Sequence, residues 1–228
     1  KRSTRADIGL QIWNPDGSTA EKSGNGIRIF AWWWSVYQNR VVGTTTFTID
    51  TGHDVVSCVV DRVLGIVDVE MGRATFDKAL IPTAEVVWAR SIQMPDGRSV
   101  CAYTVGIGNP HCVIFVDTPS DFSKIPWREW GTYLESHVLF PNRINVQFAS
   151  VVSESSIEIR IWERGAGETE ASGTSSCAVA CVAHRLGFVG DKIEMKMPGG
   201  VLKVEIESDW NVRLCGPVET VATMETDL

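Results

Sequence analysis

Two serines stand where a polar side chain could take part in chemistry, each at the start of an apolar segment. The sequence EKSGNG at residues 21–26 contains Ser23, and EASGTS at residues 170–175 contains Ser172. Both read Glu-x-Ser-Gly followed by a small polar residue, which indicates an internal duplication. A Ser-Gly turn that leads into a helix presents free backbone N–H groups at the positive end of the helix dipole, and these can bind a carboxylate. Helix capping is the simpler alternative for both serines.

Further polar side chains lie at turns near these two segments. They offer amides, an imidazole, an acid and a base, and they are Asn14, Asn109, His111, Asn145, Glu163 and Arg164. Each of them alone would more commonly be a turn residue or a surface charge. Together with the two serines they predict a polar cleft that binds a small charged molecule.

The segments 24–38 and 173–186 are predicted to be helices that position the serines. The first is apolar almost all round and the second is rich in Ala, Val and Cys. A helix that is apolar on every face must be buried on every face, for which a strongly curved sheet is the natural cover. Short β-branched segments between Gly and Pro turns are typical of strands. The predicted strands are residues 44–50, 55–60, 63–71, 99–105, 112–116, 144–151, 156–162, 193–197 and 202–207. We therefore expect an α/β (α+β) fold of two similar halves, each a curved, mostly antiparallel sheet around a central helix.

The composition is that of an ordinary globular protein. Of the 228 residues, 44% are hydrophobic and 21% are charged, and no apolar run reaches the roughly 18 residues of a membrane span. The formal net charge of −7 argues against a nucleic-acid partner, which would require a basic surface. The chain begins at Lys1 without a signal-like apolar segment. We expect a soluble cytoplasmic protein with no membrane and no nucleic-acid partner.

The six cysteines form no CxxC pair and no regular framework, which favours free thiols in a reducing compartment. Cys177 and Cys181 are four residues apart on a predicted helix, where His184 offers the only further ligand nearby. Structural packing is therefore favoured over a metal site.

Four segments in chain order resemble the diaminopimelate epimerase family, and the resemblance extends over essentially the whole chain. They are NPDGSTAEKSGNGIRIFA, GNPHCVIFVD, FPNRINVQF and WERGAGETEASGTSSCAVA, of which the last is the most specific. The resemblance implies two pseudo-symmetric domains, residues 1–72 plus 217–228 and residues 73–216, with the active site between them. It also implies a crossover near residues 71–76 and a C-terminal strand, about 217–228, that returns to the first domain. A homodimer is consistent with it.

The resemblance further implies an epimerase that interconverts LL- and meso-diaminopimelate, for lysine and peptidoglycan precursor synthesis, and that needs neither pyridoxal nor metal. Inversion at Cα requires one residue to remove a proton from one face and another to return a proton to the other. In the family two cysteines do this, and Ser23 and Ser172 occupy their positions here, with His111 and Glu163 assisting. Glu163 would also meet the α-ammonium group. The implied α-carboxylate cradle is Gly24, Asn25, Gly173 and Thr174, and the distal end of the substrate would meet Asn14, Asn109, Asn145 and Arg164.

Two departures from the family pattern affect the expected activity. A serine hydroxyl is a far weaker acid than a thiol of pKa about 8.5, so we expect epimerisation to be severely reduced or absent while fold and binding are retained. Family members also begin with a strand and a Gly-Asn-Asp-Phe segment that has no counterpart here, and we expect the parent protein to contain it. The paired serines fit deliberate replacement or a natural relative with changed chemistry.

Two alternative functions remain. One is another isomerase of the same fold, of the phenazine-biosynthesis or methylaconitate-isomerase kind. The other is a catalytically inactive paralogue that binds an amino acid.

Overall fold

The structure is a computed structural model that describes residues 3–13, 17, 19, 22–39 and 43–224. Its strands form one large sheet in the order β1-β2-β3-β4-β13-β12-β11-β9-β8-β7-β6-β5, with β10 beside β9. The helices are α1 (Gly24–Trp33), α2 (Trp127–Glu135) and α3 (Gly173–Arg185), with a π-helical turn at Trp34–Asn39 and a 3-10 turn at Pro119–Ser123.

The sheet has two parts that meet where β4 pairs with β13 and β13 pairs with β12. The first part consists of β1 (Ile8–Gly9), β2 (Thr44–Asp50), β3 (Val55–Asp61), β4 (Ile66–Arg73) and β13 (Asn211–Pro217). The second part consists of β5 (Arg90–Gln93), β6 (Ser99–Gly106), β7 (Pro110–Phe115), β8 (Asn145–Ser153), β9 (Ser156–Glu163), β10 (Gly167–Thr169), β11 (Lys192–Met197) and β12 (Gly200–Ile206). Pairing is antiparallel except for β1 with β2, β7 with β8 and β9 with β11. The predicted mixed fold with a mostly antiparallel sheet is confirmed.

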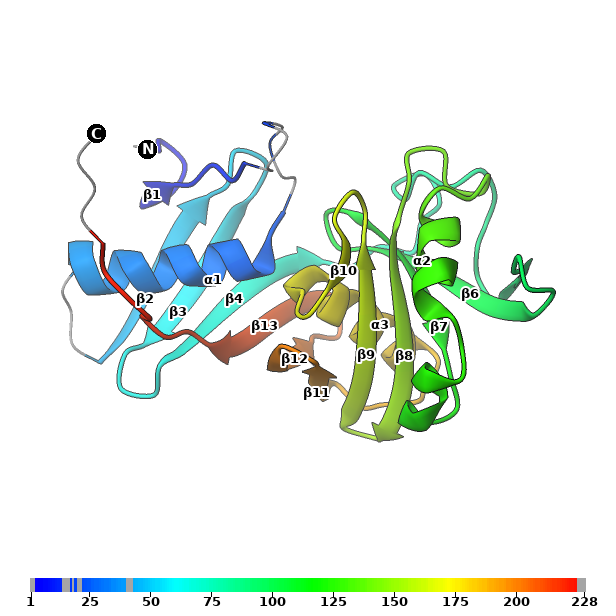
Figure 1. Ribbon diagram of the computed structural model, residues 1–228. Coiled ribbons are helices and arrows are strands. Elements are labelled where there is room, and N and C mark those ends of the chain that lie inside the picture. Colours follow the sequence, from blue (N-terminus) through cyan, green and yellow to red (C-terminus); the bar gives the residue numbers. More distant parts are fainter. Residues whose placement is uncertain (1–2, 14–16, 18, 20–21, 40–42, 225–228) are drawn as a thin grey trace.

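The helix α3 is enclosed by the second part of the sheet (Figure 1). Every residue from Gly173 to Ala183 is buried, and α3 contacts β6, β7, β8, β9, β11, β12 and β13. A helix with small side chains on all faces can be surrounded in this way because strands approach it closely from several sides. The prediction of a helix buried all round is therefore confirmed for α3.

The helix α1 lies across β2, β3 and β4 and is covered on one face (Figure 1). Ile27 and Ala31 are fully buried, whereas Ile29 and Trp33 are 60% and 43% exposed. The prediction that this helix is buried on every face is wrong, because the described strands of the first part cover one side of it.

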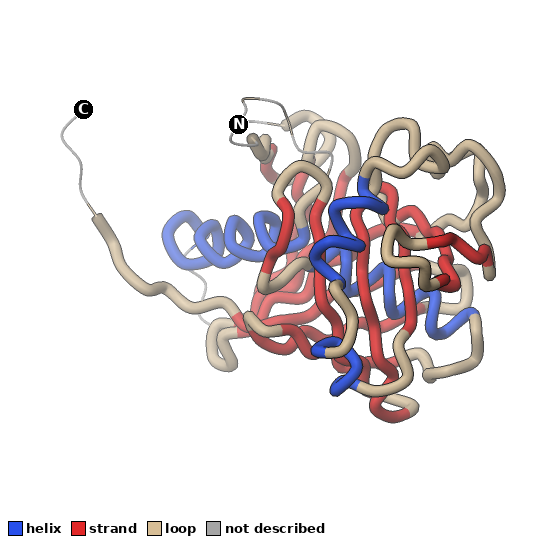
Figure 2. Tube along the Cα trace, turned by 45° about the vertical axis from the view of Figure 1, so that its right-hand side comes forward, coloured by secondary structure: helices blue, strands red, loops and turns tan. Residues whose placement is uncertain are grey.

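The helix α2 was not predicted from the sequence. Its Trp127, Trp130 and Leu134 are spaced to share one helix face, and they pack on the outer face of the sheet in a second core with Phe140 and Phe148. Figure 2 shows this helix on the side of the strands away from α3. The sequence indicates this helix only weakly, because just three apolar residues at helical spacing lie in an otherwise polar segment.

The C-terminal part of the chain differs from the expected returning strand at about 217–228. The strand β13 ends at Pro217, which aligns with Ile66, the first residue of β4, so its partner strand has no further residues to pair. Residues 218–224 contain no strand, and residues 225–228 lie outside the described part. β4 likewise begins later than predicted, because residues 62–65 form a turn in which Gly65 has φ +66. The division into two domains remains a prediction.

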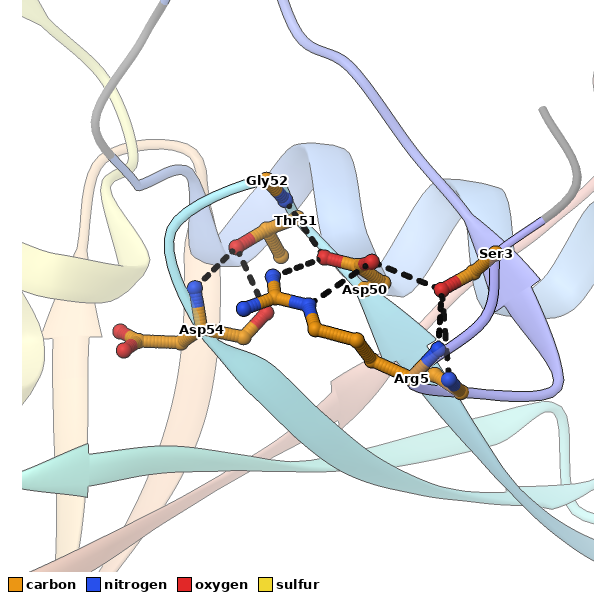
Figure 3. A network of polar contacts seen from close by, with 7 residues as sticks. Ser3, Arg5, Asp50, Thr51, Gly52 and Asp54 are labelled. Atoms are coloured by element: carbon orange, nitrogen blue, oxygen red, sulfur yellow. Dashed lines mark hydrogen bonds and ion pairs between the residues drawn. The ribbon is translucent and has the colours of Figure 1, made fainter.

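A polar network fastens the segment before β1 to the end of β2 (Figure 3). The Asp50 carboxylate accepts hydrogen bonds from the Ser3 hydroxyl at 2.7 Å and the Gly52 N–H at 2.9 Å, and it forms an ion pair with Arg5. The hydrogen bond from Arg5, followed by those from Ser3 and Gly52, holds the pKa of Asp50 well below its usual range.

Candidate functional site

The two predicted serine turns have the same local geometry. We call Ser23–Gly26 the α1 entrance and Ser172–Ser175 the α3 entrance. Ser23 is the N-cap of α1, with φ −139 and ψ 107, and its Oγ accepts the Gly26 N–H at 3.1 Å. Ser172 is the N-cap of α3, with φ −144 and ψ 127, and its Oγ accepts the Ser175 N–H at 3.4 Å. The repeated sequence motif thus forms a repeated structure, and capping is one role of each serine.

The two entrances meet at Gly24 and Gly173. A Cβ placed on either glycine would lie 3.1 Å from the Cα of the other. It would also lie 2.9 Å (Gly24) or 2.6 Å (Gly173) from the Leu214 Cδ2 on β13. Glycine at both positions therefore allows the close approach, because a Cβ on either would require the other helix or Leu214 to shift. α1 packs on the first part of the sheet and α3 lies within the second, so the contact places the neighbouring Ser23 and Ser172 at the junction of the two parts.

Backbone donors converge at this contact. The first two N–H groups of each helix, at Gly24, Asn25, Gly173 and Thr174, have no acceptor within their own helix. Each serine satisfies the next two N–H groups of its helix through its side chain and its carbonyl oxygen. The free donors and the positive ends of two helix dipoles form an anion site.

Asn25 links one entrance to the other. Its Nδ2 donates to the Ala171 carbonyl at 3.2 Å, and its buried Oδ1 has no partner among the residues that the structure describes. On the α3 side, Thr174 is 5% exposed and its Oγ1 lies 3.5 Å from the Ser172 Oγ. The four residues implied as a carboxylate cradle are therefore brought together.

His111 lies in β7 with no exposed surface. Its Nε2 lies 2.8 Å from Oδ1 of Asn109. Burial, the largest cause, lowers the pKa of His111 to about 3, the charge of Arg164 lowers it as well, and a contact with Gln147 opposes the shift. The imidazole is therefore neutral near pH 7 in this conformation. A base of such a low pKa is poorly matched to proton abstraction at that pH.

Asn145 is buried between two loops of the site. Its Nδ2 donates to the Pro110 carbonyl at 2.9 Å, and its Oδ1 accepts the Arg164 N–H at 3.0 Å. The amide thereby joins the turn before His111 to the turn that carries Glu163 and Arg164. Glu163 is the last residue of β9 and is half-buried. Asn14 lies outside the described residues.

One polar side chain at the α3 entrance was not predicted from the sequence. Gln147 is fully buried in β8, and its Nε2 donates to the Ser175 Oγ at 3.0 Å. Gln147 also lies close enough to His111 to oppose the lowering of its pKa. The signal was present, since Gln147 is one of two amides, with Asn145, in the mostly apolar segment INVQFAS.

A cavity of about 320 Å³ lies beside the α1 entrance, lined by Lys22, Asp54, Val55, Val56, Glu70, Met71, Gly72, Arg73 and Gly108. The Lys22 side chain is 5% exposed, and its Nζ donates to the Met71 carbonyl at 2.6 Å and lies 3.5 Å from the Asp54 carboxylate. This lysine was also missed. The Lys22 side chain packs between Gly72 of β4 and Gly108 in the turn before β7. It therefore contacts both parts of the sheet.

Residues 3–13, 17, 19, 22–39 and 43–224 contain neither a metal-binding cluster nor a membrane-spanning helix. No group of three or more His, Cys, Asp or Glu side chains there is arranged to hold a metal ion. Cys177 and Cys181 are buried, and burial raises the pKa of the Cys177 thiol to about 12. No described helix is long and apolar enough to cross a bilayer.

Known proteins resemble this chain in sequence and in fold. The sequence model of diaminopimelate epimerase matches residues 103–221. Diaminopimelate epimerase 2 of a Nostoc species is 42% identical over 98% of this chain and 77% of its own length. The diaminopimelate epimerase of Bacillus cereus is 34% identical over 95% of this chain and 76% of its own length. The chain belongs to the diaminopimelate epimerase family. The resemblance predicted from four sequence segments is confirmed.

Members of the diaminopimelate epimerase family are isomerases that interconvert LL- and meso-diaminopimelate. Among solved structures, a probable proline racemase from Agrobacterium radiobacter covers 100% of this chain and 74% of its own length, with a TM-score of 0.74 and 15% identity. At that identity the likeness shows the fold alone. It agrees with the predicted fold class.

Proposed function

We propose that this diaminopimelate epimerase family member binds LL- and meso-diaminopimelate between the α1 and α3 entrances. The observation that carries the proposal is the contact of the two serine-capped helices at Gly24 and Gly173. Free N–H groups from both helices suit the substrate α-carboxylate, and they would also stabilise charge that develops when the Cα proton leaves. Ser23 and Ser172 approach from different parts of the sheet, as proton transfer on two faces of Cα requires.

The distal amino-acid head of the substrate would be bound by polar groups of the second part of the sheet. Arg164 supplies a guanidinium that can bind a carboxylate through two parallel hydrogen bonds. Asn109 and Asn145 lie on the same side of the site, connected through His111 and Pro110. Glu163 would accept from the α-ammonium group. Recognition of two charged heads distinguishes this substrate from a simple amino acid.

The serines make epimerisation by this chain severely reduced or absent. A hydroxyl is a much weaker acid than a thiol, and each serine Oγ already accepts a hydrogen bond as a helix cap. His111 is a weak base because burial lowers its pKa, so it does not remove the proton of a serine hydroxyl to form an alkoxide. These observations also favour the second candidate, an amino-acid-binding paralogue without turnover.

The test is deuterium incorporation at Cα of LL-diaminopimelate in D₂O, together with formation of the meso isomer. We expect Ser23→Cys combined with Ser172→Cys to raise the rate by at least about 10²-fold, within the range of general acid–base catalysis. Ser123→Cys is the control, because it adds a thiol at an exposed serine of the 3-10 turn. A double-cysteine variant that binds the substrate but incorporates no deuterium would contradict the proposal. Binding without turnover by both the parent chain and the double-cysteine variant would identify the paralogue.

We also propose a cytoplasmic homodimer that works without metal or organic cofactor. The six free cysteines support a reducing compartment. Sedimentation of the parent protein tests the homodimer. The activity of the double-cysteine variant after treatment with a chelator tests whether a metal is needed.

A further inference from the structure

Glu135, at the end of α2, is a carboxylate buried away from the helix entrances. Its residue surface is 7% exposed. The indole N–H of Trp162 donates to its Oε2 at 2.8 Å, the Gly165 N–H donates to its Oε1 at 2.8 Å, and Arg143 forms an ion pair with Oε1. A buried carboxylate is tolerated when it is paired and hydrogen-bonded, and both oxygens of Glu135 meet that condition.

Two of these donors belong to the turn that carries Glu163 and Arg164 or to the residue before it. Trp162 precedes the turn, and Gly165 lies within it with φ +80, a conformation that favours glycine. The Arg164 N–H is held from the other side by Oδ1 of Asn145 at 3.0 Å. Two successive backbone N–H groups of the turn, at Arg164 and Gly165, are thus fixed by two different buried side chains.

The packing of α2 on β9 leaves Glu135 little freedom. A Cβ on Gly131, one helical turn before Glu135, would lie 2.7 Å from Cγ of Trp162. The helix therefore packs directly on the indole that donates to Glu135. The carboxylate is presented to the turn by a rigid helix, and a rigid support is what a precise binding site requires.

We propose that Glu135 is a positioning residue that fixes the Glu163–Arg164 turn for recognition of the amino-acid ligand. It acts through the Gly165 N–H and the Trp162 indole and does not itself touch the ligand. The inference rests on the proposed function, in which Glu163 and Arg164 bind the charged groups of diaminopimelate.

The first variant is Glu135→Gln. It replaces one accepting oxygen by an NH₂ group, which must face either the Trp162 indole N–H or the Gly165 N–H, so that two donors oppose each other. We expect Gly165 amide exchange at least about 10-fold faster and LL-diaminopimelate binding about 10-fold weaker, because small displacements of positioning groups have large effects. Hydrogen exchange followed by NMR measures the Gly165 amide, and calorimetry measures binding. Both are done at a temperature where circular dichroism shows the variant to be fully folded.

The matched control is Glu168→Gln, which removes a carboxylate from neighbouring β10. Glu168 is exposed and pairs with Arg128 of α2. An exposed ion pair contributes little, so we expect binding and Gly165 exchange to stay within about twofold of the parent.

A rescue variant separates positioning from a general packing role. Adding Trp162→Phe to Glu135→Gln removes the indole donor, so the amide oxygen can turn to Gly165. We expect slower Gly165 exchange and tighter binding than in Glu135→Gln alone. A purely structural role predicts the opposite, because the smaller ring adds a packing defect beside Gly131.

Unchanged affinity in Glu135→Gln overturns the inference even if Gly165 exchanges faster, and so does a failed rescue. If the parent protein itself binds no diaminopimelate, the proposed function fails. The Gly165 exchange in the parent, in Glu135→Gln and in the rescue variant then decides the inference by itself.

Discussion

The α1 and α3 entrances share a sequence motif and a cap geometry but differ in how they are enclosed. Ser172 and Thr174 are 5% exposed and Ser175 and Ser176 are fully buried, whereas Ser23 and Asn25 are half-buried. The α3 entrance also has extra internal bonds, from the Ser176 Oγ to the Ser172 carbonyl at 2.8 Å and from Gln147 to the Ser175 Oγ at 3.0 Å. A duplicated motif therefore sets the local turn, while the surrounding sheet sets how firmly that turn is held.

The largest expected effect tests the contact between the entrances. Gly173→Ala places a Cβ 2.6 Å from Leu214 and 3.1 Å from the Gly24 Cα, and Gly24→Ala makes slightly longer contacts. We expect the free energy of unfolding to fall by about 3 kcal/mol for Gly173→Ala and about 2 kcal/mol for Gly24→Ala, because the core becomes overpacked. This exceeds the gain of about 1 kcal/mol in helix propensity.

Urea denaturation measures both glycine variants. Gly190→Ala is the control, because its added Cβ would meet only the Glu154 carbonyl at 3.9 Å. Equal costs for Gly173→Ala and Gly190→Ala would contradict the close approach of the two helices.

The second prediction is a pH dependence of the free energy of unfolding, caused by His111 on the enclosed α3 side. The folded protein holds the pKa of His111 at about 3 through burial, while an unfolded histidine titrates near pH 6.5. Between these values the unfolded chain binds more protons, so the free energy of unfolding falls as the pH drops, by up to about 1.4 kcal/mol per pH unit. We expect a loss of about 2 kcal/mol from pH 6.5 to pH 5. His111→Gln should remove that slope in denaturation curves, and identical slopes in both proteins would rule out the buried neutral imidazole.

A third effect compares the two caps directly. Ser172→Ala leaves a fully buried Ser175 N–H without an acceptor, whereas water can reach the half-buried α1 entrance. We expect the free energy of unfolding to fall by about 2 kcal/mol for Ser172→Ala and about 1 kcal/mol for Ser23→Ala. Thermal and chemical denaturation of the two single variants give the comparison. Equal losses would mean that enclosure does not strengthen the cap.

The smallest effect lies away from both entrances. Asp50→Asn weakens the network with Ser3 and Arg5 at the edge of the first part of the sheet. Because the pKa of Asp50 is lowered in the folded protein, its contribution is present above the unfolded value of about 3.9 and is lost as the pH falls through the folded pKa. At neutral pH we expect a smaller loss of stability than for Ser23→Ala, reduced further by salt. Unfolding curves at low and high salt provide the check, and a salt-independent loss would point to packing instead.

Much of the fold could be predicted from local patterns. β2 covers the predicted residues 44–50, and α3 ends at Arg185, one residue before its predicted end. Side chains that alternate between two faces of a strand leave a period of two in the sequence, so the strands could be recognised. The helix α2 and the end of β13 were missed. The first has only three apolar anchors, and the second is set by the first residue of β4, a partner far away in the chain.

The serine caps, the glycines beside them and the family of the chain could be recognised in the sequence, because these depend on residue types at fixed spacing. The contact of Gly24 with Gly173, the enclosure of α3 but not of α1, and the neutral state of His111 became visible only in the folded structure. Distance, burial and desolvation arise from segments that are far apart in sequence. No local sequence pattern encodes these properties. The roles of Gln147, Lys22 and Glu135 could therefore be recognised only from their partners in the folded structure.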